Sequence, residues 1–211
     1  YYHPNGKPDY TEYYDNAWFK KLVQFDTTGK VISAAELDKG ESKVIFKHFN
    51  GKPYIECYYK NYKLNGLYKI INGDGTVRSI AYYKNGDRDS IYKAWYPNGK
   101  LQTEGYYTNG DKTGEWKYYW RSGQLSEVEN YVEGKLEGKD IQYNEDGAVE
   151  KEMIFKKGDL EGEYRIYGDA KQLAAVMYYK ADELLGYSYE DKNGALVPMI
   201  AVPKGSGMVT A

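Results

Sequence analysis

The chain has 211 residues, a formal net charge of −2 from 29 basic and 31 acidic side chains, and 26 tyrosines within an aromatic content of 17%. This balance of charge excludes the strongly basic surface that nucleic acids and anionic membranes attract. No apolar run approaches the ~20 residues of a membrane-spanning helix. The single cysteine, Cys57, excludes an internal disulfide.

The first residues resemble a turn that occurs later in the sequence. Residues 1–7 read YYHPNGK, which matches the WYPNGK of residues 95–100 apart from an inserted histidine. We therefore expect the chain to begin inside a repeat unit and, because it lacks an initiating methionine, to be a segment of a longer protein. Residues 198–211 are expected to be either an irregular tail or the truncated start of another unit.

Three sets of residues recur with a spacing of 24. The first set consists of turn glycines: Gly51, Gly75, Gly99, Gly123 and Gly147. The second set consists of glycines with one serine: Gly66, Ser90, Gly114, Gly138, Gly162 and Gly186. The third set is aromatic: Tyr59, Tyr83, Tyr107, Tyr131, Phe155 and Tyr179. A fixed period of this length indicates a repeat protein, and we expect about eight units over residues 1–197, the first one partial.

Residues 90–113 illustrate one unit. Two β-prone stretches, residues 91–96 and 101–107, flank an Asn98-Gly99 dipeptide. Asn-Gly between such stretches favours a hairpin with a two-residue type I′ turn, which would pair Tyr96 with Leu101, Ala94 with Thr103 and Lys93 with Glu104. Helices are disfavoured because the segments are short, rich in tyrosine and interrupted by glycine.

This pairing gives each hairpin two different faces. One face of residues 90–113 carries a more continuous apolar set, including Tyr92, Ala94 and Tyr107, and the other mixes aromatic with charged residues. We predict an all-β fold in which tandem 24-residue hairpins form one elongated, twisted, single-layer antiparallel sheet.

These motifs resemble a known repeat. Residues 114–125 read GEWKYYWRSGQL and are followed by Tyr131 and the glycines of residues 134–138. This pattern is similar to the MORN repeat, and more closely to the MORN variant of the bacterial YwqK family, whose members are described as antitoxin components of toxin–antitoxin systems. The resemblance runs from about residue 42 to residue 197 and implies a β-hairpin meander. It carries over no catalytic residue, because the motif contains none.

Few side chains have reactive chemistry. A Cys-His pair requires direct contact, and Cys57 occupies a repeat position held elsewhere by Gly105 and Glu129, so we interpret it as a small residue of the sheet rather than as a nucleophile beside His48. The turns at residues 73–75 and 144–147 are similar to calcium loops but lack the full ligand pattern of an EF-hand. We therefore expect no enzyme activity, no cofactor and no metal site.

The mixed face has one feature that points to binding. Flat rings recur on it at Trp95, Tyr119, Tyr143 and Tyr167, with Tyr106 nearby. Tyr and Trp are favoured anchors for proteins and for sugar rings. The alternative is that these rings stack on one another and hold the sheet together. The accompanying basic residues Lys69, Lys93, Lys117 and Arg165 face glutamates, so we expect a charge-balanced surface.

Two non-enzymatic functions remain, with an enzyme as the third alternative. The first is a non-enzymatic scaffold that binds another protein, for which the resemblance implies an antitoxin or immunity role with a toxin as partner. The second is a module that binds glycans or the cell wall. The resemblance also implies a bacterial source. The compartment would be the cell envelope or the exterior if a signal peptide precedes residue 1, and the cytoplasm otherwise.

Overall fold

The computed structural model describes residues 1–37, 40–48, 50–168 and 171–203. These residues contain β-strands and turns and no helix. They divide into two compact units, Tyr1–Asp111 and Lys112–Ala211. The tail that we assigned to residues 198–211 lies largely outside the described residues, which end at Pro203.

The strands of the first unit are β1 (Tyr10–Asp15), β2 (Trp18–Phe25), β3 (Val31–Glu36), β4 (Ser42–Lys47), β5 (Pro53–Lys60), β6 (Lys63–Ile71), β7 (Val77–Lys84), β8 (Asp87–Trp95) and β9 (Leu101–Thr108). Those of the second unit are β10 (Asp111–Tyr119), which begins on the last residue of the first unit, β11 (Leu125–Val132), β12 (Lys135–Leu136), β13 (Gly138–Tyr143), β14 (Val149–Lys156), β15 (Asp159–Leu160), β16 (Gly162–Tyr167), β17 (Leu173–Lys180), β18 (Glu183–Tyr189) and β19 (Ile200–Ala201).

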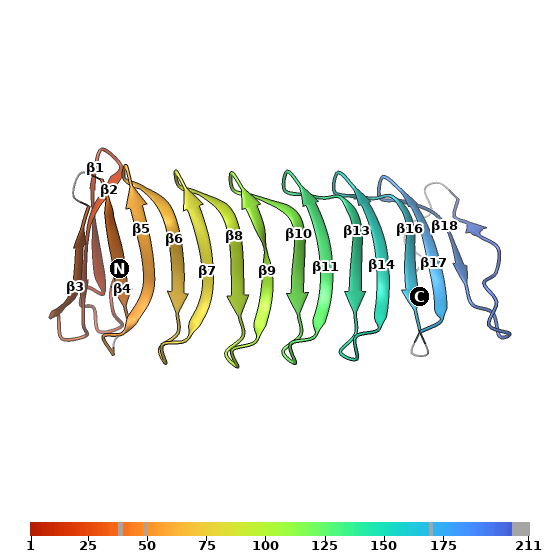
Figure 1. Cartoon of the computed structure of the whole chain (residues 1–211), viewed down its shortest axis with the longest axis horizontal. Helices are drawn as coiled ribbons and strands as arrows, with labels where there is room; N and C mark the ends of the chain where they lie inside the picture. Colours follow the sequence, from red (N-terminus) through yellow and green to blue (C-terminus); the bar gives the residue numbers. More distant parts are fainter. Residues whose placement is uncertain (38–39, 49, 169–170, 204–211) are drawn as a thin grey trace. The chain divides into compact units, whose positions relative to one another are not determined.

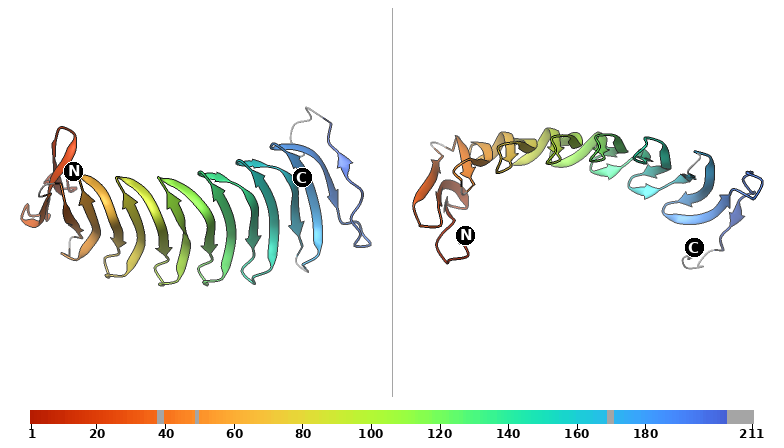
Figure 2. Two further views of the ribbon diagram at one scale, coloured as in Figure 1. Left: turned by 45° about the horizontal axis from the view of Figure 1, so that its top comes forward. Right: turned by 90° about the horizontal axis from the view of Figure 1, so that it is seen from below.

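Within each unit the strands follow one another as antiparallel hairpins (Figure 1). In the first unit β4 to β9 pair in sequence order, and in the second unit β10, β11, β13, β14, β16, β17, β18 and β19 do so, with β12 and β15 attached to β11 and β14. Figure 2 shows the same succession from two further sides. The prediction of an all-β antiparallel meander is confirmed, and the sheet does not close into a barrel.

The first three strands form a separate sheet, which the repeat pattern did not predict. This sheet packs on the beginning of the long sheet through Leu22 and Val44, both with no exposed surface, together with Phe19, Leu37 and Cys57. Two facing layers exclude water from both sides of these residues, so the most continuous apolar core of the first unit lies here.

The turn at Asn98-Gly99 differs from the predicted type I′ turn. The Gly99 amide donates to the Tyr96 carbonyl (2.9 Å), the Tyr96 amide donates to the Lys100 carbonyl (2.8 Å), and of the loop residues only Gly99 has a positive φ, of 80°. This is a three-residue loop made of a type I turn and a bulged glycine. The prediction is wrong because Pro97 has no amide with which to pair with Lys100 beside a two-residue turn, and because its fixed negative φ suits the first central position of a type I turn.

The turn type changes the register next to it. Ala94 pairs with Thr103 and Lys93 with Glu104, as predicted, but Leu101 pairs with Trp95 instead of Tyr96, across a register shift. Type I′ turns do occur, at the opposite ends of the hairpins. At Asn109-Gly110, for example, both φ angles are positive, at 50° and 92°. Three-residue and two-residue turns thus alternate along the sheet.

The second glycine set marks strand positions with a left-handed backbone. Gly66, Gly114, Gly138 and Gly162 have φ angles between 64° and 99°, and Ser90 adopts the same conformation at 74°. Gly186 does not share it. An L-residue in this conformation is strained because its Cβ approaches the following carbonyl oxygen.

Residues on one face of the sheet, which we call the inner face, alternate in size from strand to strand. Val44 pairs with Cys57, Cys57 with Tyr68, Tyr68 with Ala81, Ala81 with Tyr92, and Tyr92 with Gly105. A small residue beside each ring leaves space for the ring to lie on the sheet, and the ring covers it, so Cys57, Ala81 and Gly105 are buried. The interpretation of Cys57 as a small sheet residue agrees with this row.

We expect Ser90→Gly to stabilise the protein by about 1 kcal/mol, because it removes the strain of a positive φ. The matched control is Ser79→Gly, in β7, where φ is not positive and glycine should cost about 0.5–1 kcal/mol. Urea unfolding of the three proteins measures both changes. Destabilisation by both glycines would contradict the strain at Ser90.

Candidate functional site

The face opposite to the inner face, which we call the outer face, carries paired charges. In the first unit Lys93 Nζ lies 2.9 Å from a Glu104 oxygen, and Glu56 lies within reach of both Lys43 (3.0 Å) and Lys69 (4.0 Å). In the register Glu56 faces Lys69 and Glu104 faces Lys93, whereas Lys43 reaches Glu56 diagonally from the neighbouring strand. Lys43, Lys69 and Lys93 on the outer face of this unit are therefore each compensated by a glutamate.

Four of the predicted binding residues lie where the strands meet the three-residue turns. Trp95, Tyr119, Tyr143 and Tyr167 each stand at a register shift and pair with Leu101, Leu125, Val149 and Leu173. All four are half-buried. The hydroxyl of Tyr167 donates to Glu152 (3.0 Å), which ties that ring to the sheet.

The fifth predicted residue, Tyr106, belongs to a more exposed row. Tyr58 on β5, Tyr82 on β7 and Tyr106 on β9 are 40%, 39% and 53% exposed. They stand two strands apart, about 10 Å, on the outer face of the first unit. We call them the tyrosine row. Tyr58 and Tyr82 were missed by the sequence analysis although they share the spacing of the repeat.

Cys57 and His48 have separate structural roles. Cys57 is 1% exposed, and its thiol donates to the Val44 carbonyl at 3.8 Å. Burial raises the pKa of this thiol to about 12, which opposes formation of a thiolate. His48 Nε2 lies 2.8 Å from the Ile71 carbonyl at the next turn, and His3 Nε2 lies 3.2 Å from the Phe25 carbonyl. Both histidines therefore connect one turn to the following one.

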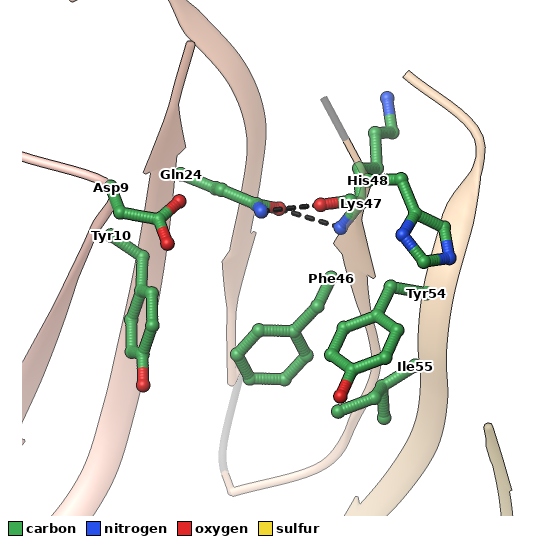
Figure 3. A pocket seen from close by; sticks show the side chains of 8 residues that line it. All are labelled: Asp9, Tyr10, Gln24, Phe46, Lys47, His48, Tyr54 and Ile55. Atoms are coloured by element: carbon green, nitrogen blue, oxygen red, sulfur yellow. Dashed lines mark hydrogen bonds between the residues drawn. The ribbon is translucent and has the colours of Figure 1, made fainter. Parts of the chain in front are cut away.

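A cavity of about 270 Å³ lies between the three-stranded sheet and the first strands of the long sheet (Figure 3). Gln24, from β2, crosses this space and exchanges two hydrogen bonds with the backbone of Lys47 at the end of β4. The remaining lining is given by Asp9, Tyr10, Phe46, His48, Tyr54 and Ile55. The Gln24 side chain bonds both the amide and the carbonyl of Lys47, as a neighbouring strand would. We therefore interpret its role as joining the two sheets.

The inner face of the second unit carries an acidic cluster formed by Glu127, Glu129 and Asp140. Glu127 and Glu129 lie on β11 and Asp140 on β13, and one carboxylate oxygen from each lies within 4.8 Å of the others. Asp140 is only 4% exposed, and its Oδ1 has no hydrogen-bond partner among the described residues. Burial, followed by the negative charges of Glu127 and Glu129, raises the pKa of Asp140 to about 7.

One cation lies beside this cluster. Lys112 Nζ is 3.8 Å from Glu129 and donates to the hydroxyls of Tyr118 (2.6 Å) and Tyr131 (3.2 Å). It also lies 4.5 Å above the Trp116 ring. The sequence contained a signal for the cluster, because Asp140 interrupts a column that is aromatic at Tyr92, Trp116 and Tyr164.

Three stretches of the chain match the protein-family model described as the MORN repeat variant: residues 41–61, 88–109 and 112–133. The chain contains MORN variant repeats. Each matched MORN stretch covers one hairpin with its three-residue turn, namely β4–β5, β8–β9 and β10–β11. No catalytic family matches, and no match was found among curated proteins. The described residues include no helix that is long and apolar enough to cross a membrane.

The buried position of Cys57 on the inner face predicts that its thiol reacts slowly. We expect Ellman's reagent to modify Cys57 in the folded MORN array at least about a hundredfold more slowly than in denaturant, because a buried thiol reacts only after local opening. The rate of thionitrobenzoate release measures this. Equal rates with and without denaturant would show that Cys57 is accessible.

The raised pKa of Asp140 predicts how stability depends on pH. The carboxyl binds its proton more tightly in the folded chain, with a pKa of about 7 against an ordinary 3.8, so the contribution of Asp140 to stability is greatest below about pH 4 and is lost as the pH rises through 7. In metal-free buffer at pH 8, Asp140→Asn should therefore stabilise the protein, by at most ~4 kcal/mol, and the gain should shrink towards pH 5. Urea unfolding at both pH values checks this, with the exposed Asp146→Asn as control. A gain independent of pH would contradict the assignment.

Proposed function

We propose that this MORN repeat array is a non-enzymatic scaffold whose outer face binds another protein. The observation that carries the proposal is the tyrosine row of Tyr58, Tyr82 and Tyr106, which exposes three rings on alternate strands of one unit. Tyrosine is enriched among the few residues that supply most of the energy of a protein interface. It offers a large apolar ring with little side-chain entropy to lose.

The surroundings of the row favour a protein partner. The ion pairs of Glu56 and Glu104 with their lysines lie on the same face, so a partner meets rings bordered by compensated charges. This arrangement corresponds to an apolar centre with a polar rim, as in many protein interfaces. Rings about 10 Å apart on successive hairpins suit a partner that lies across several strands.

The half-buried aromatic residues are a second part of the proposal. Trp95 lies in the same unit as the tyrosine row, and Tyr119, Tyr143 and Tyr167 hold the same repeat position in the second unit. We propose that Trp95 contributes at the margin of the contact with the first unit, and that Tyr119, Tyr143 and Tyr167 can anchor a partner on the second unit, since all four rings are already held in place by the strand ends. Less ordering is then needed when a partner binds.

The most specific form of the proposal comes from the resemblance to the YwqK group. On that basis we propose that the bacterial partner is a toxin, and that the scaffold neutralises it as an antitoxin or immunity protein. The second candidate is a glycan or the cell wall, because the exposed tyrosine rings are also suited to stacking on sugar rings.

The test compares partners captured by three proteins. The row variant carries Tyr58→Ser, Tyr82→Ser and Tyr106→Ser, and the control carries Tyr13→Ser and Tyr189→Ser, which remove equally exposed rings elsewhere. We expect a partner of the native chain to bind the control normally and the row variant at least about thirtyfold more weakly, since one hot-spot residue is worth ~2 kcal/mol or more. Moderate salt should have little effect, because the face is charge-balanced.

The alternatives give different results. Equal binding of a partner to all three proteins would contradict the role of the tyrosine row. Retention of the native chain and the control by insoluble peptidoglycan, with loss in the row variant and no protein partner, would favour the glycan function. Capture of a toxin whose activity is inhibited by the native chain alone would support the antitoxin form.

A further inference from the structure

We propose that Glu127, Glu129 and Asp140 form a binding site for a hard divalent cation of the calcium class. The site is independent of the tyrosine row, because it lies on the inner face of the second unit. It also differs from the hairpin turns that we considered as calcium loops, because its residues belong to the strands β11 and β13.

The geometry brings three oxygen ligands together. One carboxylate oxygen of each residue lies within 4.8 Å of the others, about twice the calcium–oxygen contact of about 2.3–2.6 Å. The register accounts for this convergence: Glu127 pairs with Gln142 and Val128 with Ile141, so Asp140, the next residue of β13 in this register, lies beside Glu129. Side chains at positions 127 and 129 project on the same face because they are two residues apart in one strand.

The other repeats show that the fold does not require acids at these positions. The residues that hold the position of Asp140 in neighbouring units are Tyr92, Trp116 and Tyr164. Those equivalent to Glu129 are Gly105, Met153 and Met177, and those equivalent to Glu127 are Thr103, Lys151 and Ala175. Three acids therefore replace apolar, small or basic residues at three adjacent positions of the inner face. Burying acids so close together costs free energy of folding unless a positive charge or hydrogen-bond donors compensate them.

Asp140 is the strongest indication of a ligand. It is 4% exposed and shares a small volume with two other acids, and its Oδ1 accepts no hydrogen bond from the described residues. Glu127 and Glu129 each have a donor, from Gln142 Nε2 (2.8 Å) and the Tyr131 hydroxyl (2.9 Å), which orient their carboxylates. A buried carboxylate oxygen normally has a donor or a metal, so the oriented pair and the unpartnered Asp140 fit a cation between them.

The charges point to a divalent ion. Lys112, 3.8 Å from Glu129, compensates one of the three negative charges, which leaves two. Lys112 is itself held by the hydroxyls of Tyr118 and Tyr131. The ligands are all oxygens, which favours calcium or manganese over zinc. Magnesium fits less well, because it requires shorter contacts and near-ideal octahedral geometry.

The test uses terbium, a luminescent ion with the ligand preference of calcium, on the full chain. Trp116, Tyr118 and Tyr131 surround Lys112 and Glu129, so a bound terbium ion should show luminescence sensitised by these rings. We expect saturable luminescence with one ion per chain, displaced by calcium and much less by magnesium. Asp140→Asn and, separately, Glu127→Gln should abolish the saturable signal, whereas the control Glu150→Gln, an exposed acid on β14, should leave it unchanged.

Calcium should also raise the melting temperature of the native chain and not that of Asp140→Asn, because an ion that binds only the folded state stabilises it. Circular dichroism establishes that each variant is folded, and the two separate acid variants provide a second measurement if one does not fold. The absence of saturable binding, or equal binding by the native chain and both folded acid variants, would overturn the proposal. Loss of signal in Glu150→Gln as well would overturn it by showing diffuse binding to surface acids.

Discussion

The pairing of a large residue with a small one across neighbouring strands is the constraint on which the sheet depends. Tyr68 and Tyr92 lie beside Cys57, Ala81 and Gly105, and this size alternation gives each ring a place on the inner face. A shift of one residue would move the rings to the opposite face. The two turn types therefore have to keep the register constant, which explains why their glycines recur without slipping.

Basic side chains also contact the aromatic rings of the inner face. Arg88 lies above the rings of Tyr92 and Tyr107, at 5.8 and 5.3 Å, and Lys112, 24 residues later, lies above Trp116 and Tyr131. Such contacts are favourable because the ring faces are electron-rich. In the second unit the same cation also lies next to Glu129, so a structural element of the repeat borders the acidic cluster. The proposed cation site thus borders a basic residue whose ring contacts recur in the repeat.

The two proposed sites depart from the repeat in different ways. The tyrosine row follows the spacing of the repeat and occupies positions outside the packed inner face, since the rings of Tyr58, Tyr82 and Tyr106 are exposed. The acidic cluster departs from the repeat at positions of the packed inner face, and Asp140 is therefore buried. A binding surface can therefore spread over several hairpins, whereas a buried cluster is confined to the strands where the acids occur.

The sequence by itself determined the β-hairpin repeat and its MORN character, because glycines and aromatic residues at a constant spacing leave few other folds. It also determined the pairing of Lys93 with Glu104. Only the tertiary structure decided the separate sheet of β1 to β3 and the meeting of Asp140 with Glu127 and Glu129. The physical reason is that these features depend on contacts between strands, whereas the spacing of residues along the chain reports only which positions are equivalent.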